Sequence, residues 1–162
     1  MTELMTAEFA TTRRLRRDEL LLYLQVIATA GSETTTRLLG WAGKVPAEHP
    51  DQRREYVNNR LLLPAAIEEV PRFEPPAPHV SRYVTRDVEY FGQTVTAGNA
   101  TMMIVGAANR DPRRFGHDSE TFNIHRDPHQ HLAFGVGTHF CLGNALARLE
   151  GRIALDEPAV LS

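Results

Sequence analysis

The 162-residue chain contains one cysteine, one lysine and one tryptophan. A single cysteine excludes an internal disulfide. No apolar run approaches the ~20 residues that a membrane-spanning helix needs, and the N-terminus lacks the apolar core of a signal peptide. The formal net charge of −2 gives no reason to expect nucleic acid or a membrane as a partner. We therefore expect a single globular domain that works in the cytoplasm.

Apolar residues recur at three- and four-residue steps from Asp18 to about Lys44, which predicts one long helix. The middle of this helix, residues 30–36 (AGSETTT), is unusual because glycine and threonine are poor helix formers. Threonine hydroxyls also compete for backbone carbonyls. We expect the helix to be bent or opened there for a functional reason; the alternative is a kinked helix whose threonines bond back to carbonyls.

The rest of the chain divides into further helices, strands and a loop. Helices are expected over residues 62–73, with Pro64 near the start, and over residues 142–155. Residues 80–105 alternate or are β-branched, which predicts a small antiparallel sheet. Polar residues from Ala108 to Leu132 show no period and predict a long ordered loop. The expected fold class is mainly α with a small antiparallel β-sheet.

The lone Cys141 lies in the stretch FGVGTHFCLG, residues 134–143, directly before the last predicted helix. Unpaired N–H groups and the positive dipole end at a helix start favour a negatively charged sulfur. Glycines allow the turns that bring amides close to the sulfur, and apolar side chains keep water away. These residues are Gly135, Gly137 and Gly143, and Phe134, Phe140 and Leu142. A shielded, hydrogen-bonded thiolate is what a haem iron needs as a stable axial ligand.

Three other interpretations of this stretch stay open at this point. A glycine-rich turn before a helix is typical of phosphate binding, but the lysine and the serine or threonine of a P-loop are missing. An inert buried cysteine is the commonest fate of a lone cysteine. Zinc would need further ligands, and four histidines do lie nearby without a recognised finger spacing: His125, His129, His131 and His139.

The stretch FGVGTHFCLG resembles the haem-binding loop of the cytochrome P450 monooxygenases, Phe-Gly-x-Gly-x-His/Arg-x-Cys-x-Gly, and fills every fixed position. The resemblance implies haem b as the cofactor, Cys141 as the proximal iron ligand and His139 as a hydrogen-bond donor to a haem propionate. It further implies that residues 1–162 form part of a P450 haem-binding domain, the C-terminal half of the P450 fold.

The unusual helix centre also resembles the distal helix of this family. On that resemblance Glu33 and Thr34 are the acid and alcohol that deliver protons in a dry pocket. Ala30 and Gly31 would leave room for oxygen and substrate beside the haem.

Two further sets of residues fit the same family. Glu69 and Arg72 are three apart and so share one side of a helix, which by itself is typical of a solvated surface pair. The resemblance implies that they form a buried charge triad with Arg126, which would pin the segment before the cysteine loop. Arg82 would be a second propionate ligand.

The resemblance covers residues 14–155 but less than half of the family's length, so the N-terminal half and the closing strands of the fold are expected to be absent. Pro158 would stop the last helix. Pro46 and Pro71 lie inside predicted helices, where proline costs ~3 kcal/mol or more. A helix that is buried in the complete fold would expose its apolar surface here.

Two hypotheses on function follow. The first is a haem-thiolate monooxygenase fragment that acts on a small organic substrate and takes electrons from a ferredoxin or flavoprotein reductase. A basic face for such a donor could consist of Arg110, Arg113, Arg114 and Arg148. The alternative is a truncated, catalytically inactive product that binds haem weakly or not at all.

Overall fold

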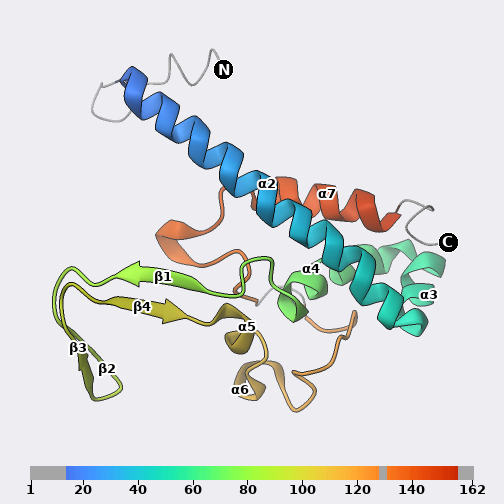
Figure 1. Ribbon diagram of the computed structural model, residues 1–162. Helices are drawn as coiled ribbons and strands as arrows, with labels where there is room; N and C mark the ends of the chain where they lie inside the picture. The colour runs from blue at the N-terminus through green and yellow to red at the C-terminus, as the bar shows by residue number, and fades with distance from the viewer. Residues whose placement is uncertain (1–13, 128–130, 157–162) are drawn as a thin grey trace. The chain divides into compact units, whose positions relative to one another are not determined.

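The computed structural model describes residues 14–127 and 131–156, so His129 and Pro158 lie outside the described residues. Within these ranges the chain is mainly helical with short antiparallel strands, which confirms the predicted class (Figure 1). The helices are α2 (Arg17–Glu48), α3 (Pro50–Asn58), α4 (Leu63–Phe73), α5 (Val105–Ala108), α6 (Pro112–Phe115) and α7 (Asn144–Asp156), with 3-10 turns η1 (Arg60–Leu62) and η3 (Gly137–His139). The strands are β1 (Val80–Tyr83), β2 (Val88–Tyr90), β3 (Gln93–Val95) and β4 (Ala100–Met103). Among the helices described here, none is both long enough and apolar enough to cross a bilayer.

The contacts divide the chain into two compact units, Met1–Thr36 and Arg37–Ser162, and the boundary falls within α2. The cysteine loop, the charge networks and the hydrophobic core all belong to the second unit. The residues predicted for the distal helix, 30–34, belong to the first unit.

Residues 30–36 are α-helical throughout, so the predicted opening of the helix is not present there. The hydroxyl of Thr34 donates to the carbonyl of Ala30 at 2.6 Å, and the hydroxyl of Thr36 donates to Ser32 at 2.8 Å. These bonds to carbonyls one turn earlier let the threonines stay within the helix instead of breaking it.

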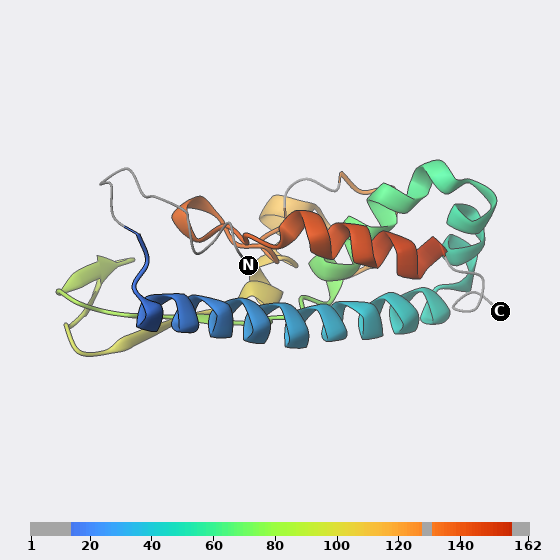
Figure 2. The ribbon, with the colours of Figure 1, turned by 90° about the horizontal axis from the view of Figure 1, so that it is seen from above.

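The core of the second unit forms where the end of α2, α3, α4 and α7 meet, together with the segment around Phe122 and Ile124. Helix α7 packs against α4, as the ribbon shows from two directions (Figure 1, Figure 2). Their close approach depends on Gly151, because a Cβ built at this glycine would lie 2.8 Å from Cγ1 of Ile67. Fully buried members of this core are Tyr56, Ile124, Val45, Val70 and Leu155.

Both internal prolines lie in helices and are buried. Pro46 is in the last turn of α2, where its missing N–H leaves the carbonyl of Ala42 without the usual partner, and the helix ends at Glu48. Pro71 lies inside α4, which nonetheless runs to Phe73, and the amide of Glu74 closes its last turn on the carbonyl of Val70 at 2.8 Å. Burial of the surrounding face of α4 therefore outweighs the cost of Pro71.

The strands form two separate two-stranded antiparallel sheets, where the sequence predicted one. Strand β1 pairs with β4 in the register Val80↔Met103 to Tyr83↔Ala100, and the hairpin β2–β3 is nested between them. The single-turn helix α5 lies at the junction of the predicted strand region and the predicted loop, and the single-turn helix α6 lies inside that loop. Asp111 accepts from the amide of Arg113 at 2.9 Å, which caps α6.

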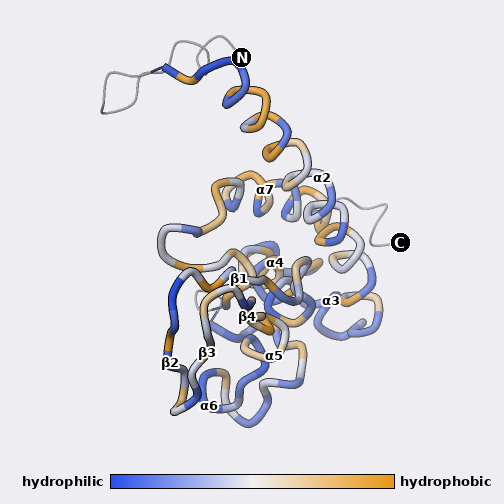
Figure 3. The backbone as a smooth tube through the Cα atoms, turned by 60° about the vertical axis from the view of Figure 1, so that its left-hand side comes forward, coloured by the Kyte–Doolittle hydropathy of each residue, from blue (hydrophilic) through white to orange (hydrophobic). Residues whose placement is uncertain are grey.

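Helix α7 begins at Asn144, two residues later than predicted, and is apolar on more than one side. Gly151 and Leu155 are buried against the core, while Leu146, Leu149 and Ile153 are each more than half exposed. Both apolar and polar stretches are visible along its tube in Figure 3. The expected exposed apolar surface is thus present on α7.

Candidate functional site

The cysteine loop, residues 134–143, is closed by its own backbone. The amide of Cys141 donates to the carbonyl of Phe134 at 2.8 Å, and the amide of Phe140 donates to Gly137 at 3.0 Å. Gly135 and Gly137 have φ angles of 70° and 67°, a left-handed conformation that residues with a Cβ rarely adopt. A Cβ at Gly135 would also lie 3.3 Å from the carbonyl oxygen of His139. Glycine is therefore required at these two positions for the loop to fold back on Phe134.

Cys141 lies three residues before the first residue of α7 and is half-buried. Its carbonyl accepts from the side-chain amide of Asn144 at 2.7 Å, which ties the cysteine to the start of the helix. The cysteine backbone is thus held at both ends, by Phe134 and by Asn144. The thiol is placed near a helix N-terminus, where negative charge is favoured.

Three exposed apolar residues of the loop lie near the cysteine in the sequence, and we call them the apolar wall. They are Val136, Phe140 and Leu142, which are 67%, 49% and 80% exposed. A flat apolar macrocycle with an iron at its centre would cover the exposed surface of these side chains and place the iron beside the thiol. His139, in η3, is also exposed and offers a donor at the edge of this wall. The donor set and the apolar surroundings therefore fit a haem.

A zinc site is not supported by the described histidines. In residues 14–127 and 131–156, no cluster of three or more His, Cys, Asp or Glu side chains could hold a metal ion. His125 instead lies 2.7 Å from the carboxylate of Glu55 on the surface, and His131 contacts Glu68 at 3.0 Å.

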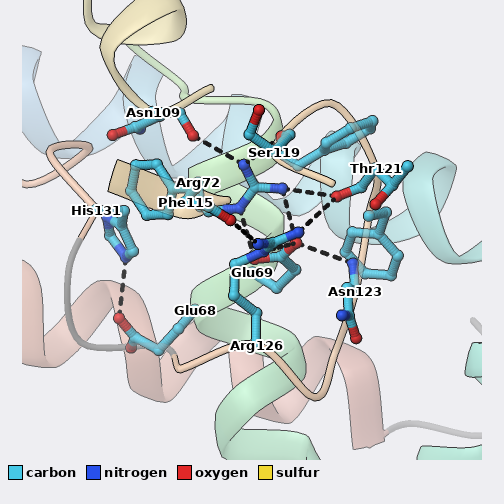
Figure 4. Close-up of polar contacts among 12 residues, drawn as sticks. Glu68, Glu69, Arg72, Asn109, Phe115, Ser119, Thr121, Asn123, Arg126 and His131 are labelled. Carbon is cyan, nitrogen blue, oxygen red and sulfur yellow. Dashed lines mark hydrogen bonds and ion pairs between the residues drawn. The ribbon is translucent and has the colours of Figure 1, made fainter. Parts of the chain in front are cut away.

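The structure brings together the three residues of the predicted charge triad. Arg72 is 2% exposed and makes a bidentate pair with Glu69, with Nε–Oε2 at 2.7 Å and Nη2–Oε1 at 2.8 Å. Arg126 approaches the same carboxylate, with its Nε 3.5 Å from Oε1 (Figure 4). The amide of Asn123 also donates to this oxygen, at 2.9 Å. Glu69 thus has a cation or an amide at each oxygen, as a buried carboxylate requires.

The two arginines fasten the segment that follows α5. Three carbonyls accept from Arg72 at 2.8–2.9 Å, those of Asn109, Ser119 and Thr121. Arg126 donates to the carbonyl of Phe115 at 2.6 Å and to the carboxylate of Asp118 at 2.9 Å. The hydrogen bond from Arg126 holds the pKa of Asp118 below its usual value. Each arginine therefore fixes the course of a loop that has little regular structure.

The remaining predicted site residues are placed as follows. Arg82 is exposed on β1, where its Nη1 donates to the carbonyl of Ser81 at 2.9 Å. Ala30, Glu33 and Thr34 lie in the first unit, on α2. Three arginines of the expected basic face are held in ion pairs, Arg110 with Glu74 at 3.0 Å, Arg113 with Asp111 at 2.6 Å and Arg148 with Glu68.

An open cleft of about 590 Å³ flanks the cysteine loop. Its lining includes Arg114, Phe115, His131, Gly135 and Phe140. Cys141 is not among the lining residues, so this cleft does not contain the thiol.

Sequence reasoning missed the partners of Glu68. This residue contacts His131 and Arg148, which lie 63 and 80 positions away in the chain. No periodicity connects positions so far apart. The one available signal is the pair of adjacent glutamates in a helix with a single basic residue, because a second buried carboxylate needs a partner of its own.

Comparisons with known proteins agree on one family. A family model described as cytochrome P450 matches residues 2–157. The putative cytochrome P450 YjiB of Bacillus subtilis is 41% identical over 145 residues, which are 90% of this chain and 36% of that protein. The steroid C26-monooxygenase of Mycolicibacterium smegmatis is 40% identical over 144 residues, 89% of this chain and 36% of that protein.

A solved structure, cytochrome P450 CYP109Q5 from Chondromyces apiculatus, superposes with a TM-score of 0.91 at 39% identity, over 99% of this chain and 40% of that chain. The chain therefore spans little more than a third of the length of the curated relatives it matches. Proteins of this family bind haem b through a cysteine thiolate. Because the family model matches nearly the whole sequence, the chain belongs to the cytochrome P450 family.

Proposed function

We propose that this chain supplies the thiolate side of the haem site of a monooxygenase, with Cys141 as the axial ligand. The observation that carries the proposal is the closed loop before α7, in which Phe134 and Asn144 hold the cysteine backbone at both ends. When bound, haem supplies the iron centre at which dioxygen is split: one atom enters a small organic substrate and the other leaves as water, with two electrons and two protons consumed.

The residues around Cys141 have separate roles in this proposal. Cys141 would provide the thiolate, and a bound haem would cover the exposed apolar side chains of Phe140 and Leu142, which shield nothing in its absence. His139 and Arg82 are exposed donors, and they would bind the two propionates. The triad of Glu69, Arg72 and Arg126 holds the segment that leads to the loop and does not touch the reacting atoms.

On the family resemblance, Glu33 and Thr34 would hold and pass on the protons that this reaction consumes. The single hydroxyl proton of Thr34 is donated to the carbonyl of Ala30 at 2.6 Å, so in this rotamer the oxygen can only accept. To pass a proton on, the hydroxyl must turn away from Ala30. Glu33 then restores the proton through water, as a carboxylic acid can.

Electrons would come from a ferredoxin or flavoprotein reductase. Of the four arginines predicted for a docking face, Arg113 has 89% of its side chain exposed, although its guanidinium is paired with Asp111 at 2.6 Å. Arg110 and Arg148 are paired and only 30% and 34% exposed, so we assign them structural roles before any role in docking.

The direct test is the absorption spectrum of the purified chain after haem addition, reduction with dithionite and exposure to carbon monoxide. Thiolate ligation predicts a strongly red-shifted Soret band that is lost in Cys141→Ala and kept in His139→Ala. An unchanged band in Cys141→Ala would overturn the ligand assignment. A wild-type spectrum like that of free haem would favour the alternative, an inactive product that binds haem weakly or not at all.

Thr34→Ala tests the proton path separately. Electrons should be diverted to peroxide while the Soret band stays unchanged. Thr36→Ala is the matched control, because Thr36 makes the same bond back to a carbonyl one turn earlier. Equal peroxide yields from both variants would refute the role of Thr34.

A further inference from the structure

A second charge cluster lies beside the Glu69 network and links α4, the start of the cysteine loop and α7. Its centre is Glu68, whose side chain is 8% exposed. Arg148 of α7 donates two hydrogen bonds to this carboxylate, from Nε to Oε1 at 2.5 Å and from Nη2 to Oε2 at 3.0 Å. The Nε2 atom of His131 lies 3.0 Å from Oε2 (Figure 4). One carboxylate therefore serves two partners from distant parts of the chain.

The hydrogen bonds of His131 define its protonation state. Its Nδ1 accepts from the amide of Ala133 at 3.1 Å. A backbone amide can only donate, so Nδ1 carries no proton and the single ring proton is on Nε2, where it is donated to Glu68. The His131 side chain is 4% exposed, and Arg148 already balances the charge of Glu68. A proton added to Nδ1 would remove the acceptor of the Ala133 hydrogen bond. It would also give the cluster two cations, His131 and Arg148, for the single carboxylate of Glu68.

The charge state of Glu68 is consistent with this assignment. Burial raises the pKa of its carboxyl, but hydrogen bonds from His131 and Arg148 outweigh burial, and the net shift is below the usual value. Glu68 is thus ionised at neutral pH and can accept from both partners.

Two members of the cluster contact Phe134, the first residue of the cysteine loop. The guanidinium of Arg148 lies 4.4 Å from the centre of the Phe134 ring, and the His131 ring centre lies 5.6 Å from it. The carbonyl of the same Phe134 accepts the amide of Cys141 at 2.8 Å. The residue that anchors the cysteine backbone is therefore itself held by His131 and Arg148.

A neighbouring bond fixes the same segment from the other network. The amide of Leu132 donates to Oδ1 of Asn109 at 2.7 Å, and the carbonyl of Asn109 accepts from Arg72. Residues 131–134 are thus tied to α4 twice, through Glu68 and through Arg72.

We propose that His131, held as the neutral Nε2–H tautomer by Glu68, is a positioning residue for Cys141, acting through the Ala133 amide and the Phe134 carbonyl. The inference rests on the proposed function of Cys141 for its importance to haem ligation. The placement of the cysteine backbone can be measured without haem.

The first experiment is nuclear magnetic resonance on the ¹⁵N-labelled full chain without haem at neutral pH. Long-range correlations of the imidazole should identify His131 as the neutral tautomer with its proton on Nε2. A proton on Nδ1, or a charged ring, would overturn the assignment. This outcome does not depend on haem binding.

The second experiment uses two substitutions that each keep one of the two bonds. In His131→Asn the amide oxygen takes the place of Nδ1 and can accept from Ala133. In His131→Gln the amide nitrogen takes the place of Nε2 and can donate to Glu68. Exchange of the Cys141 amide proton should remain close to wild type in His131→Asn. It should be faster by about five- to tenfold in His131→Gln and His131→Ala, the worth of one intramolecular hydrogen bond.

His125→Gln is the matched control, because His125 pairs with Glu55 on the surface, where both side chains are about half exposed. It should leave Cys141 exchange unchanged. Wild-type exchange in His131→Gln, or equal losses in His131→Asn and His131→Ala, would refute the positioning role.

The same variants, loaded with haem, separate this inference from the proposed function. The red-shifted fraction of the Soret band under carbon monoxide should fall in His131→Gln and be retained in His131→Asn. If wild type itself lacks the band, the proposed function fails, while the tautomer and exchange measurements still decide whether His131 positions the loop.

Discussion

Arg72→Met should be among the most destabilising single substitutions in this chain. Arg72 has five N–H donors and all five are used, two on Glu69 and three on backbone carbonyls. Both side chains of the pair are 2% exposed. Methionine fills a similar volume but leaves Glu69 buried without its main counter-charge. Removing one partner of a buried ion pair costs about 3–5 kcal/mol of unfolding free energy.

The remaining contacts of Glu69 affect the loss of unfolding free energy expected for Arg72→Met in both directions. Arg126 stays 3.5 Å from the carboxylate and the Asn123 amide stays at 2.9 Å, so part of the charge remains compensated. Three carbonyls lose their donor at the same time, which adds to the cost. Arg72→Lys keeps the charge but offers three donors to five acceptor contacts, so its effect should be intermediate.

The chain contains a matched control in the pair Asp51–Arg54. It has the same three-residue spacing on a helix, but its side chains are 84% and 72% exposed. An exposed pair is worth about 0–1 kcal/mol, so Arg54→Met should barely change stability. Urea unfolding followed by circular dichroism measures both variants. The reasoning is refuted if Arg72→Met and Arg54→Met differ by less than about 1 kcal/mol, because burial would then not matter.

Two further predictions concern α7 and Glu68. Gly151→Ala should lower the unfolding free energy by about 1–3 kcal/mol, because its Cβ would overlap Ile67 in a closed core. Gly40→Ala, with nothing within 4 Å of its Cβ, should raise stability by about 0.5–1 kcal/mol. Opposite signs in thermal unfolding support the packing described; equal signs contradict it. Burial raises the pKa of Glu68, but hydrogen bonds from His131 and Arg148 lower it below the usual 4.5. The contribution of ionised Glu68 to the unfolding free energy is therefore complete above that pH and is lost as the pH falls through the lowered pKa. In urea titrations, the difference in unfolding free energy between wild type and Glu68→Gln should be constant near neutral pH and shrink below about pH 4.5. A difference that grows on acidification would contradict the predicted direction.

Much of this architecture could be predicted because it depends on local pattern. Helical periodicity predicted the ends of α2, α4 and α7 to within about four residues. The positions of turn residues predicted the strand region. The motif around Cys141 predicted a loop before a helix, and the structure shows why Gly135 and Gly137 are needed there. The three-residue spacing of Glu69 and Arg72 predicted a shared helix side.

The α-helical course of residues 30–36 rests on local bonds as well, because Thr34 and Thr36 donate to carbonyls one turn earlier, as the alternative stated for this segment expected. Other features depend on contacts that no local pattern reveals. The strands divided into two sheets because one hairpin is nested inside the pairing of β1 with β4. The cluster of Glu68, His131 and Arg148 joins residues far apart in sequence. Such pairings follow from tertiary packing, which sets partners only after the helices have met.

The central claim is that the sulfur of Cys141 binds haem iron, and iron K-edge X-ray absorption of the ferric haem complex tests it most directly. Thiolate ligation predicts one sulfur atom bound to the iron, lost in Cys141→Ala and replaced by a light atom in Cys141→Ser. Four methionines are the other sulfur sources in the chain, so the alanine variant is the necessary control. A first shell of nitrogen and oxygen alone in the wild type, or a sulfur that persists in Cys141→Ala, would contradict the account.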